Sequence, residues 1–230
     1  MADLEDLIDV EFQTRKKLFP DPQAFGKRDD VLSRVKTTRE SITSMTPRSV
    51  AWSISTQLYN FYNQVYRCPP ETIIDATGNA GGNTISFASR FTSVIAFEIK
   101  STTASVLKEN IAEYGLSIPV HNRDFLTFLV RDKPEELRNL RPDIIFIDPP
   151  WYWNGRFNAD MCLDPNMTIP MNMILDLIWS FTTAGFVAVK VPAKTRLSTV
   201  ESRVFVYRQI DILVFVRPRT QSLLFKKRDS

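Results

Sequence analysis

The sequence predicts an α/β fold: a mostly parallel, seven-stranded sheet covered by helices, with an antiparallel hairpin at its C-terminal end. From Thr72 onward, short runs rich in β-branched residues alternate with helical stretches, which is typical of a parallel sheet whose strands are connected by helices. The 230 residues are enough for one large domain with a core that needs no disulfide or metal. A hydrophobic fraction of 43% excludes a disordered or collagen-like chain.

A short helical N-terminal appendage, residues 1–45, is predicted to precede a domain of residues 46–230. The appendage has an amphipathic start, a turn at Phe19-Pro20-Asp21-Pro22 and dense charge. A helix is predicted to begin at Thr46-Pro47, because threonine can accept an amide hydrogen bond as N-cap and proline is tolerated at the first helical position. Cys68-Pro69-Pro70 is expected to end this helix.

The remaining elements are predicted from the spacing of apolar residues, which changes between the spacing typical of strands and that typical of helices. The predicted strands are 72–77, 93–98, 118–121, 143–148 and 186–191, followed by the β-rich runs 204–216, with a break near Gln209, and 222–227. The predicted helices are 83–90, 101–114, 125–140 and 169–182. No helix separates the last two β-rich runs, which therefore predict the antiparallel hairpin.

Composition also limits the function and the location. Cys68 and Cys162 are far apart and have no His or Cys companions at ligand spacing, so no zinc site or disulfide framework is predicted. There is no apolar run of membrane-spanning length, and the acidic first residues do not form a secretory signal. We therefore expect an intracellular protein, cytoplasmic or nuclear, of cellular or viral origin. A net charge of +3 permits a polyanionic partner without requiring one.

A glycine-rich turn follows the first strand of the predicted sheet, in the stretch Asp75–Thr84. A turn of this kind between a strand and a helix lets backbone amides approach a ligand closely. Glu98 closes the second strand, at a spacing from Asp75 where an acidic side chain can accept the hydroxyls of a ribose. Asp124 follows the third strand and Asp148 ends the fourth. Successive strands thus place acidic side chains at the edge where open α/β sheets bind ligands.

The fourth strand is followed by Asp148-Pro149-Pro150-Trp151. The prolines have no amide hydrogens, so the motif presents carbonyl oxygens and a carboxylate, and the aromatic side chain can stack on a flat ring. Hydrogen-bond acceptors beside a stacking platform suit the exocyclic amine of a nucleobase. The alternative is a rigid turn with core aromatics.

These motifs, in this order, resemble those of class I S-adenosylmethionine-dependent methyltransferases, which have a Rossmann-like fold. More narrowly, Gly81-Gly82-Asn83-Thr84, Pro149-Pro150-Trp151 and Thr46-Pro47 resemble the trimethylguanosine synthase family, which methylates the 2-amino group of 7-methylguanosine RNA caps. The similarity begins near Arg15-Lys16-Lys17-Leu18-Phe19 and includes Val189–Pro192, where the family has a strand ending in proline. The resemblance implies a monomeric enzyme that uses S-adenosylmethionine and capped RNA, without a metal.

The resemblance also implies roles for individual residues. Asp75 and Gly81 would hold the methionine part of the cofactor, Glu98 the ribose and Asp124 the adenine amine, while Asp148 and Pro149 would orient the amine that is methylated. Trp151 would stack on the guanine. Further members of the implied cofactor site are Thr46, Thr77, Gly78, Asn83, Thr84, Phe125 and Asp148. Further members of the implied substrate site are Phe19, Lys16, Lys17, Tyr152, Trp153, Pro192, Lys194 and Arg196.

Several of these residues have a structural alternative. Phe19 is either a second wall for a base or a staple for the appendage. Lys16, Lys17, Lys194 and Arg196 are candidate contacts for cap phosphates or RNA backbone, although basic surface side chains are usually only solvated. Trp52 and Trp179 fall on predicted helices and are expected in the core.

Three other functions remain open: methylation of a ribose 2′-hydroxyl, methylation of another base amine, and RNA binding without catalysis. Gly185–Lys190 resembles the strand of ribose 2′-O-methyltransferases that ends in a catalytic lysine, and Asp148 and Lys190 match two members of that family's Lys-Asp-Lys-Glu tetrad, but no later acid is well placed. Asp148 also stands where cap enzymes have serine, which is closer to methyltransferases acting on other base amines. The Gly78-Asn79 order and the aromatic pair Tyr152-Trp153 depart from the cap family too. A non-catalytic RNA-binding subunit would explain the altered loop, although three retained acids argue against it.

Overall fold

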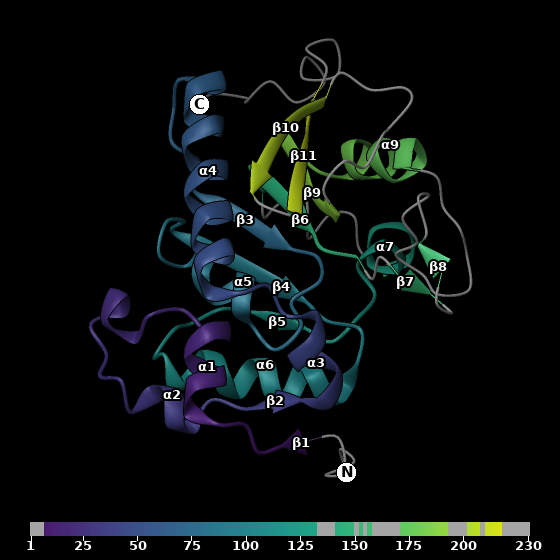
Figure 1. Ribbon diagram of the computed structural model, residues 1–230. Coiled ribbons are helices and arrows are strands. Elements are labelled where there is room, and N and C mark those ends of the chain that lie inside the picture. The colour runs from purple at the N-terminus through teal and green to yellow at the C-terminus, as the bar shows by residue number, and fades with distance from the viewer. Residues whose placement is uncertain are drawn as a thin grey trace. The chain divides into compact units, whose positions relative to one another are not determined.

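The computed structural model describes residues 7–132, 141–149, 152–153, 156–157, 171–192, 202–207 and 210–217 (Figure 1). The chain divides into two compact units, Met1–Phe125 and Leu126–Ser230, and each is described by itself. The predicted appendage lies entirely within the first unit. The predicted domain boundary at residue 45 stays a prediction.

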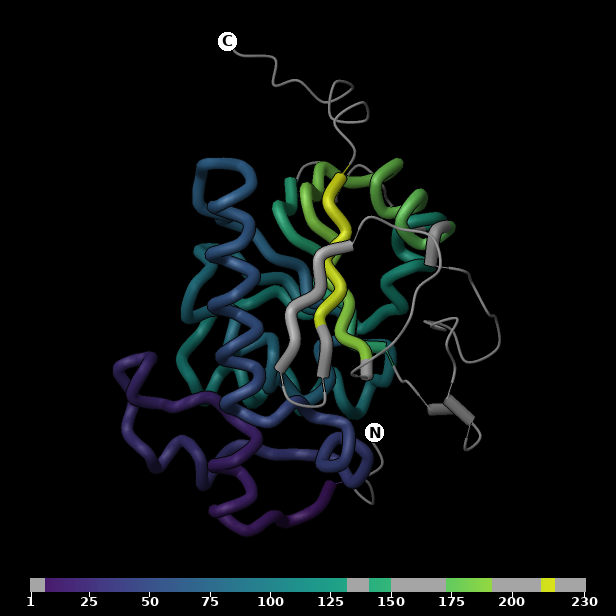
Figure 2. The backbone as a smooth tube through the Cα atoms, turned by 45° about the horizontal axis from the view of Figure 1, so that its top comes forward, coloured from purple at the N-terminus to yellow at the C-terminus, as the bar shows by residue number. Residues whose placement is uncertain are grey.

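The N-terminal segment of the first unit consists of short helices and a two-stranded ribbon. Its elements are β1 (Leu7–Ile8), α1 (Phe12–Leu18), the 3-10 helix η2 (Pro22–Phe25), α2 (Val31–Arg34), β2 (Thr37–Thr38) and α3 (Arg39–Ser44). β1 and β2 pair in antiparallel fashion, with Leu7 opposite Thr38. Figures 1 and 2 show this segment, in purple and blue, beside α6 (Ser101–Glu113).

Hydrophobic side chains of this segment share a core with the strands and helices that follow. Phe19, Leu32 and Val35 are buried in one cluster with Leu107 and Tyr114 of the α6 region. The Tyr114 hydroxyl donates a 2.6 Å hydrogen bond to the Pro20 carbonyl. Of the two alternatives for Phe19, the structure therefore favours the structural one, because its ring is fully buried in this core.

Helix α4 (Arg48–Tyr66) buries Val50, Ile54 and Leu58, as its apolar spacing predicts. The expected N-cap at Thr46 is wrong. Pro47 is the N-cap, no side chain caps the helix, and the Pro47 carbonyl accepts from the amides of Val50 and Ala51. Thr46 instead accepts a hydrogen bond from Asn83 Nδ2 at 3.0 Å, which removes its hydroxyl from the capping position.

Three parallel strands form the sheet of the first unit, in the order β3–β4–β5. They are β3 (Thr72–Asp75), β4 (Ser93–Phe97) and β5 (Val120–His121), joined by α5 (Gly82–Phe87) and α6. Each lies within its predicted range, and the helices begin within one residue of the predicted starts. Ile73 and Ile74 are completely buried, which explains their continuous apolar pattern.

Four strands of the described part of the second unit are hydrogen-bonded in the order β6–β9–β11–β10. They are β6 (Ile144–Ile147), β9 (Phe186–Pro192), β10 (Ser202–Tyr207) and β11 (Ile210–Val216). β6 and β9 are parallel, whereas β11 is antiparallel to both β9 and β10. An antiparallel C-terminal hairpin is thus confirmed, but both of its strands lie within residues 202–216, whereas the prediction took its second strand from the run 222–227. The run 222–227 lies outside the described residues.

The helices in the described part of the second unit are α9 (Met171–Phe181), the short α7 (Phe125–Thr127), which begins at the unit boundary, and the π-helix η3 (Phe128–Asp132). The helix predicted over 125–140 is therefore described only as far as Asp132. A small antiparallel pair, β7 (Tyr152–Trp153) and β8 (Arg156–Phe157), was not predicted. None of the described helices is long and apolar enough to cross a membrane.

Candidate functional site

The loop after β3 is held in place by Asp75. Its carboxylate is completely buried and accepts hydrogen bonds from the Thr77 amide at 3.2 Å and the Thr84 hydroxyl at 2.7 Å. These bonds join the end of β3 to the first turn of α5 across the glycine-rich turn. Asp75 and Thr84, both predicted cofactor residues, therefore organise the loop from inside.

The glycines of this loop are required by close packing and by backbone conformation. A Cβ atom at Gly78 would lie 2.7 Å from Leu107 Cδ2 and 3.3 Å from the Phe97 carbonyl oxygen. Gly81 has a φ of +107°, which only glycine adopts readily. Asn79 has a φ of +49° and occupies the left-handed region, where asparagine is among the best tolerated non-glycine residues. The unusual Gly78-Asn79 order is thus compatible with a tight turn.

Glu98, the residue after β4, faces this loop. One of its oxygens accepts the Asn79 amide and the other the Lys100 amide, both at 2.9 Å. Burial raises the pKa of Glu98 above its ordinary value, and the two amides oppose that effect. An ionised carboxylate has about four acceptor sites, so Glu98 retains capacity for the hydroxyls of a ribose.

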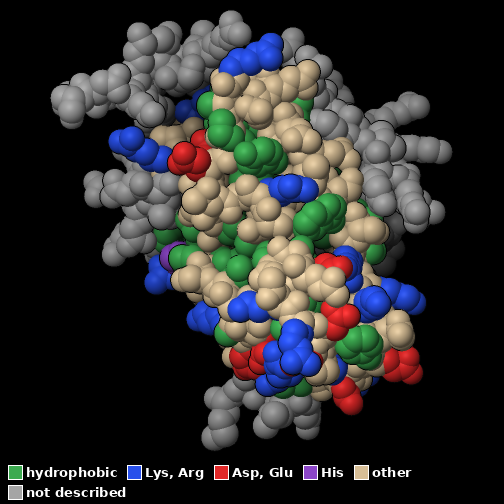
Figure 3. Space-filling model, turned by 90° about the vertical axis from the view of Figure 1, so that its left-hand side faces the viewer, with side chains coloured by type: hydrophobic (Ala, Val, Ile, Leu, Met, Phe, Trp, Pro, Cys, Tyr) green, Lys and Arg blue, Asp and Glu red, His purple; other side chains and the backbone are tan. Residues whose placement is uncertain are grey.

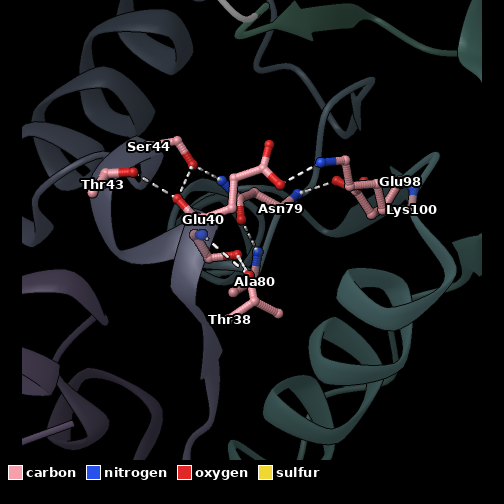
Figure 4. Close-up of polar contacts among 9 residues, drawn as sticks. Thr38, Glu40, Thr43, Ser44, Asn79, Ala80, Glu98 and Lys100 are labelled. Carbon is pink, nitrogen blue, oxygen red and sulfur yellow. Dashed lines mark hydrogen bonds and ion pairs between the residues drawn. The ribbon is translucent and has the colours of Figure 1, made fainter. Parts of the chain in front are cut away.

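Helix α3 of the N-terminal segment is tied to the same loop (Figure 4). Asn79 Nδ2 donates a 2.9 Å hydrogen bond to Ser44 Oγ, and Lys100 forms an ion pair with Glu40. The loop amide at Ala80 is satisfied by Asn79 Oδ1 at 2.7 Å. The glycine-rich loop is therefore held between α3 and the end of β4.

A second tie between the N-terminal segment and the loop comes from α6. Asn110 is completely buried, its Oδ1 accepts the Lys36 amide at 2.7 Å, and its Nδ2 donates to the carbonyls of Lys36 and Ala80 at 2.8 Å. One side chain thus joins three parts of the first unit.

Two more predicted cofactor residues follow β5. Asp124 is half-buried and lies directly before α7. The Phe125 ring is buried and packs edge-on against Phe97, with 5.1 Å between ring centroids. Phe125 therefore supports the end of β4 from within the core.

In the second unit, Asp148 and Pro149 follow the carboxyl end of β6. Lys190, on the neighbouring strand β9, donates from Nζ to Asp148 Oδ2 at 2.7 Å. The two strands are parallel and Ile147 pairs with Val189, so Asp148 and Lys190 occupy the next matched positions. The sheet register brings this carboxylate and this ammonium together.

The other predicted substrate residues are placed only in part. Lys16 and Lys17 are exposed on α1. Pro192 is the last residue of β9, and Tyr152 and Trp153 form β7. Only the backbone of these three residues is described. Trp151, Lys194 and Arg196 are not among the described residues.

Sequence reasoning missed two features of the site. Lys190 was considered only as part of a rival tetrad, although a lysine inside the apolar strand Phe186–Val191 signals a buried charge that needs a partner. The contacts of Ser44 with Asn79 and of Glu40 with Lys100 have no signal in the local sequence, because they join residues far apart in the chain.

The residues at the ends of β3 and β4 fit S-adenosylmethionine. A half-buried carboxylate with acceptor capacity, Glu98, stands beside a backbone turn whose positive φ angles allow close approach. No group of three or more His, Cys, Asp or Glu side chains that could hold a metal ion occurs among the described residues.

Comparison with known proteins points to one family. Residues 70–163 match the family model for RNA cap guanine-N2 methyltransferases. The chain is 34% identical over 110 residues to trimethylguanosine synthase of Schizosaccharomyces pombe, covering 47% of this chain and 42% of that protein. It is 33% identical over 84 residues to an uncharacterised protein of Acanthamoeba polyphaga mimivirus, covering 36% of this chain and 31% of that one. The chain thus spans less than half the length of these curated relatives.

Solved structures share the fold at low sequence identity. A proposed methyltransferase of Porphyromonas gingivalis has a TM-score of 0.57 at 17% identity, covering 89% of this chain and 47% of that one. An S-adenosylmethionine-dependent methyltransferase of Neisseria gonorrhoeae has a TM-score of 0.50 at 17% identity, covering 69% of this chain and 65% of that one. The chain therefore has the Rossmann-like fold of class I S-adenosylmethionine-dependent methyltransferases and, over residues 70–163, resembles the RNA cap guanine-N2 methyltransferase family.

Proposed function

We propose that the protein transfers a methyl group from S-adenosylmethionine to the exocyclic 2-amino group of a 7-methylguanosine RNA cap. The observation that carries the proposal is the family match, because residues 70–163 include both the loop Asp75–Thr84 and the motif Asp148-Pro149-Pro150-Trp151. The retained acids Glu98 and Asp124 support cofactor binding. The expected intracellular location and monomeric state belong to the same proposal.

In this mechanism, S-adenosylmethionine supplies a methyl group on a positively charged sulfur. Asp148 and the Pro149 carbonyl accept hydrogen bonds from the guanine amine, which aims its nitrogen lone pair at the methyl carbon. On transfer, a nitrogen–carbon bond would form as the sulfur–carbon bond breaks, the electron pair of the broken bond would stay on sulfur, and the amine proton would pass to water. The carboxylate of Asp148 stabilises the charge that the amine gains until the amine proton leaves. Catalysis on this account is mainly positioning and exclusion of water.

Trp151 stacks on the guanine in this proposal. Replacing it with alanine should weaken substrate binding by about 1–3 kcal/mol, as expected for loss of one stacked base. Trp151→Phe, which keeps a flat ring, is the matched control and should retain most of the affinity. Equal affinities of the alanine variant and the wild type would assign Trp151 to the core instead.

The direct test is methyl transfer from labelled cofactor to the dinucleotide 7-methylguanosine triphosphoguanosine and to the same compound without the 7-methyl group. We expect label only on the 7-methylated compound, released after digestion in a 2-N-methylated cap fragment. Asp148→Asn should lose most of the turnover when cofactor and substrate are both saturating. Intact turnover in that variant would reject the role given to Asp148.

A second candidate function is methylation of a ribose 2′-hydroxyl, which the Lys190–Asp148 contact favours. A lysine side chain held beside a carboxylate at 2.7 Å could position a substrate hydroxyl between the two groups. Label that remains on a ribose after digestion would support this function over the first. Cofactor binding without label on any RNA would point to a different amine, and absence of cofactor binding would favour a non-catalytic RNA-binding subunit.

A further inference from the structure

A groove of about 810 Å³ opens on the first unit between α1, η2, α3 and the start of α4. We call it the α1–α4 groove, and its walls include Lys16, Lys17, Asp21, Arg48 and Trp52. Figure 3 views the molecule from the side of α4 and shows Lys and Arg side chains gathered over the lower part of that face, with acidic ones among them. The volume of the α1–α4 groove is in the range of binding sites for small molecules.

The groove has an excess of positive charge. Among its wall residues, Arg48 forms an ion pair with Asp21, which leaves Lys16 and Lys17 as the uncompensated charges. Both lysines are exposed, and neither makes an ion pair with a described residue. Arg15, beside them in the chain, is bound to Asp9 at 2.8 Å. A ligand with negative charge is therefore the complement of this groove.

Trp52 gives the groove an aromatic wall. It was expected in the core, but its side chain is half-buried and lines the groove, with the guanidinium of Arg90 5.0 Å from its ring centroid. A cation stacked on the ring holds the indole in one orientation. Trp52 is therefore an ordered flat surface beside two uncompensated lysines.

The aromatic surface continues along α4. Tyr59 and Tyr66 follow Trp52 at intervals of seven residues, which places all three side chains on one side of the helix, about two turns apart. Tyr59 is half-buried and Tyr66 is 37% exposed. Helix α4 contains no acidic residue. The stripe thus presents aromatic side chains without charge that would repel phosphates, although the Tyr59 ring already packs against Phe91 and the Tyr66 ring against Tyr62.

We propose that the α1–α4 groove and the aromatic stripe of α4 bind single-stranded RNA, with Lys16 and Lys17 on phosphates and Trp52 under a base. The chemistry is that of general single-strand binding, in which lysines follow the backbone and bases stack on aromatic rings. An acidic peptide would match the lysines but would not use an ordered indole followed by two tyrosines.

The inference rests on the proposed function for its biological meaning, because a capped RNA has a strand that follows the cap. The groove adjoins the cofactor loop within the first unit: Arg48 and Pro47 in its wall follow Thr46, which is hydrogen-bonded to Asn83 in the first turn of α5. Nucleotides beyond the cap would occupy this groove and distinguish capped transcripts from free cap nucleotides.

The test measures binding of an uncapped, fluorescein-labelled RNA of about ten nucleotides by fluorescence anisotropy, without cofactor. Trp52→Ala should weaken binding roughly tenfold. Lys16→Gln with Lys17→Gln should weaken it and reduce the slope of log affinity against log salt by about 1.4, since each neutralised phosphate of a single strand contributes about 0.7. Lys108→Gln, an exposed lysine of α6, is the matched control and should bind as the wild type.

The proposal would be overturned if the double lysine variant bound RNA with the affinity and the salt slope of the wild type. It would also be overturned if Lys108→Gln lost as much affinity as the double lysine variant. An acidic peptide that competes with RNA and binds the Trp52→Ala variant as well as the wild type would also overturn it. Both lysines are exposed, so their replacement should not disturb folding, which unfolding curves check. The anisotropy measurement uses neither a cap nor methyl transfer. Its result can therefore be interpreted even if the cap methylation proposal fails, and the methyl-transfer assay can be interpreted even if the groove does not bind RNA.

Discussion

Lys190 Nζ lies 2.7 Å from Asp148 Oδ2, and the two side chains are only 5% and 14% exposed. They occupy matched positions on neighbouring parallel strands, one step beyond the Ile147–Val189 pair. A charge this deeply buried is costly without compensation, and in this pair the opposite charges of the two side chains offset part of that cost. The ion pair also fixes the direction of the carboxylate that ends β6.

The ion pair predicts strong coupling between the two residues. Lys190→Met leaves the Asp148 carboxylate without this ammonium and should lower the free energy of unfolding by about 3–5 kcal/mol. The double variant Lys190→Met with Asp148→Asn removes both charges and should be more stable than Lys190→Met alone. Urea unfolding of the wild type, both single variants and the double variant measures the coupling. Additive losses would show that the two side chains act independently.

The raised pKa of Glu98 predicts that cofactor affinity depends on pH. Ribose hydroxyls donate most strongly to an ionised carboxylate, so affinity for S-adenosylmethionine should rise as the pH increases through the pKa of Glu98. Because burial raises that pKa above 4.5, the loss on acidification should begin at a higher pH than for an ordinary glutamate. Calorimetric titration at a series of pH values that starts below 4.5 and extends upward to neutrality measures it.

The contribution of Glu98 to stability has the opposite sign. A raised pKa in the folded state means that folding favours the protonated form, so this contribution is fully present below 4.5 and is lost as the pH rises through the raised value. Glu98→Gln should remove both pH dependences. An unchanged binding profile in that variant would mean that another group is titrating.

The left-handed backbone at Asn79 predicts an unusual ranking of substitutions. Asn79→Ala and Asn79→Gly both lose the hydrogen bonds to Ser44 and Ala80, but only glycine adopts a φ of +49° without cost. The alanine variant should therefore be less stable than the glycine variant by about 1 kcal/mol. Chemical unfolding compares the two. Equal stabilities would indicate that the loop rearranges around alanine.

The buried side chain of Asn110 should hold the cofactor loop on the N-terminal segment. Asn110→Ala leaves the Lys36 amide and the Ala80 carbonyl without this partner and should lower the free energy of unfolding by about 1–3 kcal/mol. Lys108→Ala, exposed on the same helix, should change it by less than about 0.5 kcal/mol. If Asn110→Ala lowered the free energy of unfolding no more than Lys108→Ala does, water would be taking over the hydrogen bonds of the Asn110 amide.

Local pattern was sufficient for most elements. The strands that became β3, β4, β6 and β9 were predictable because buried parallel strands are short, continuous apolar runs between turn residues. The start of α4 was misassigned by one residue, because a Thr-Pro pair satisfies the local rules for capping while Asn83, distant in the chain, competes for the threonine hydroxyl. The small pair β7–β8 has no comparable period and was missed.

Sequence by itself determined the α/β class, the glycine-rich turn and the positions of Asp75, Glu98, Asp124 and Asp148 at or just beyond strand ends, because these depend on short-range periodicity and on the chemistry of single residues. Only the tertiary structure decided that Lys190 faces Asp148, that Ser44 and Glu40 of α3 contact Asn79 and Lys100, and that Trp52 lines a groove. Such contacts join residues that are distant along the chain. They arise from sheet register and helix packing, which no local pattern specifies.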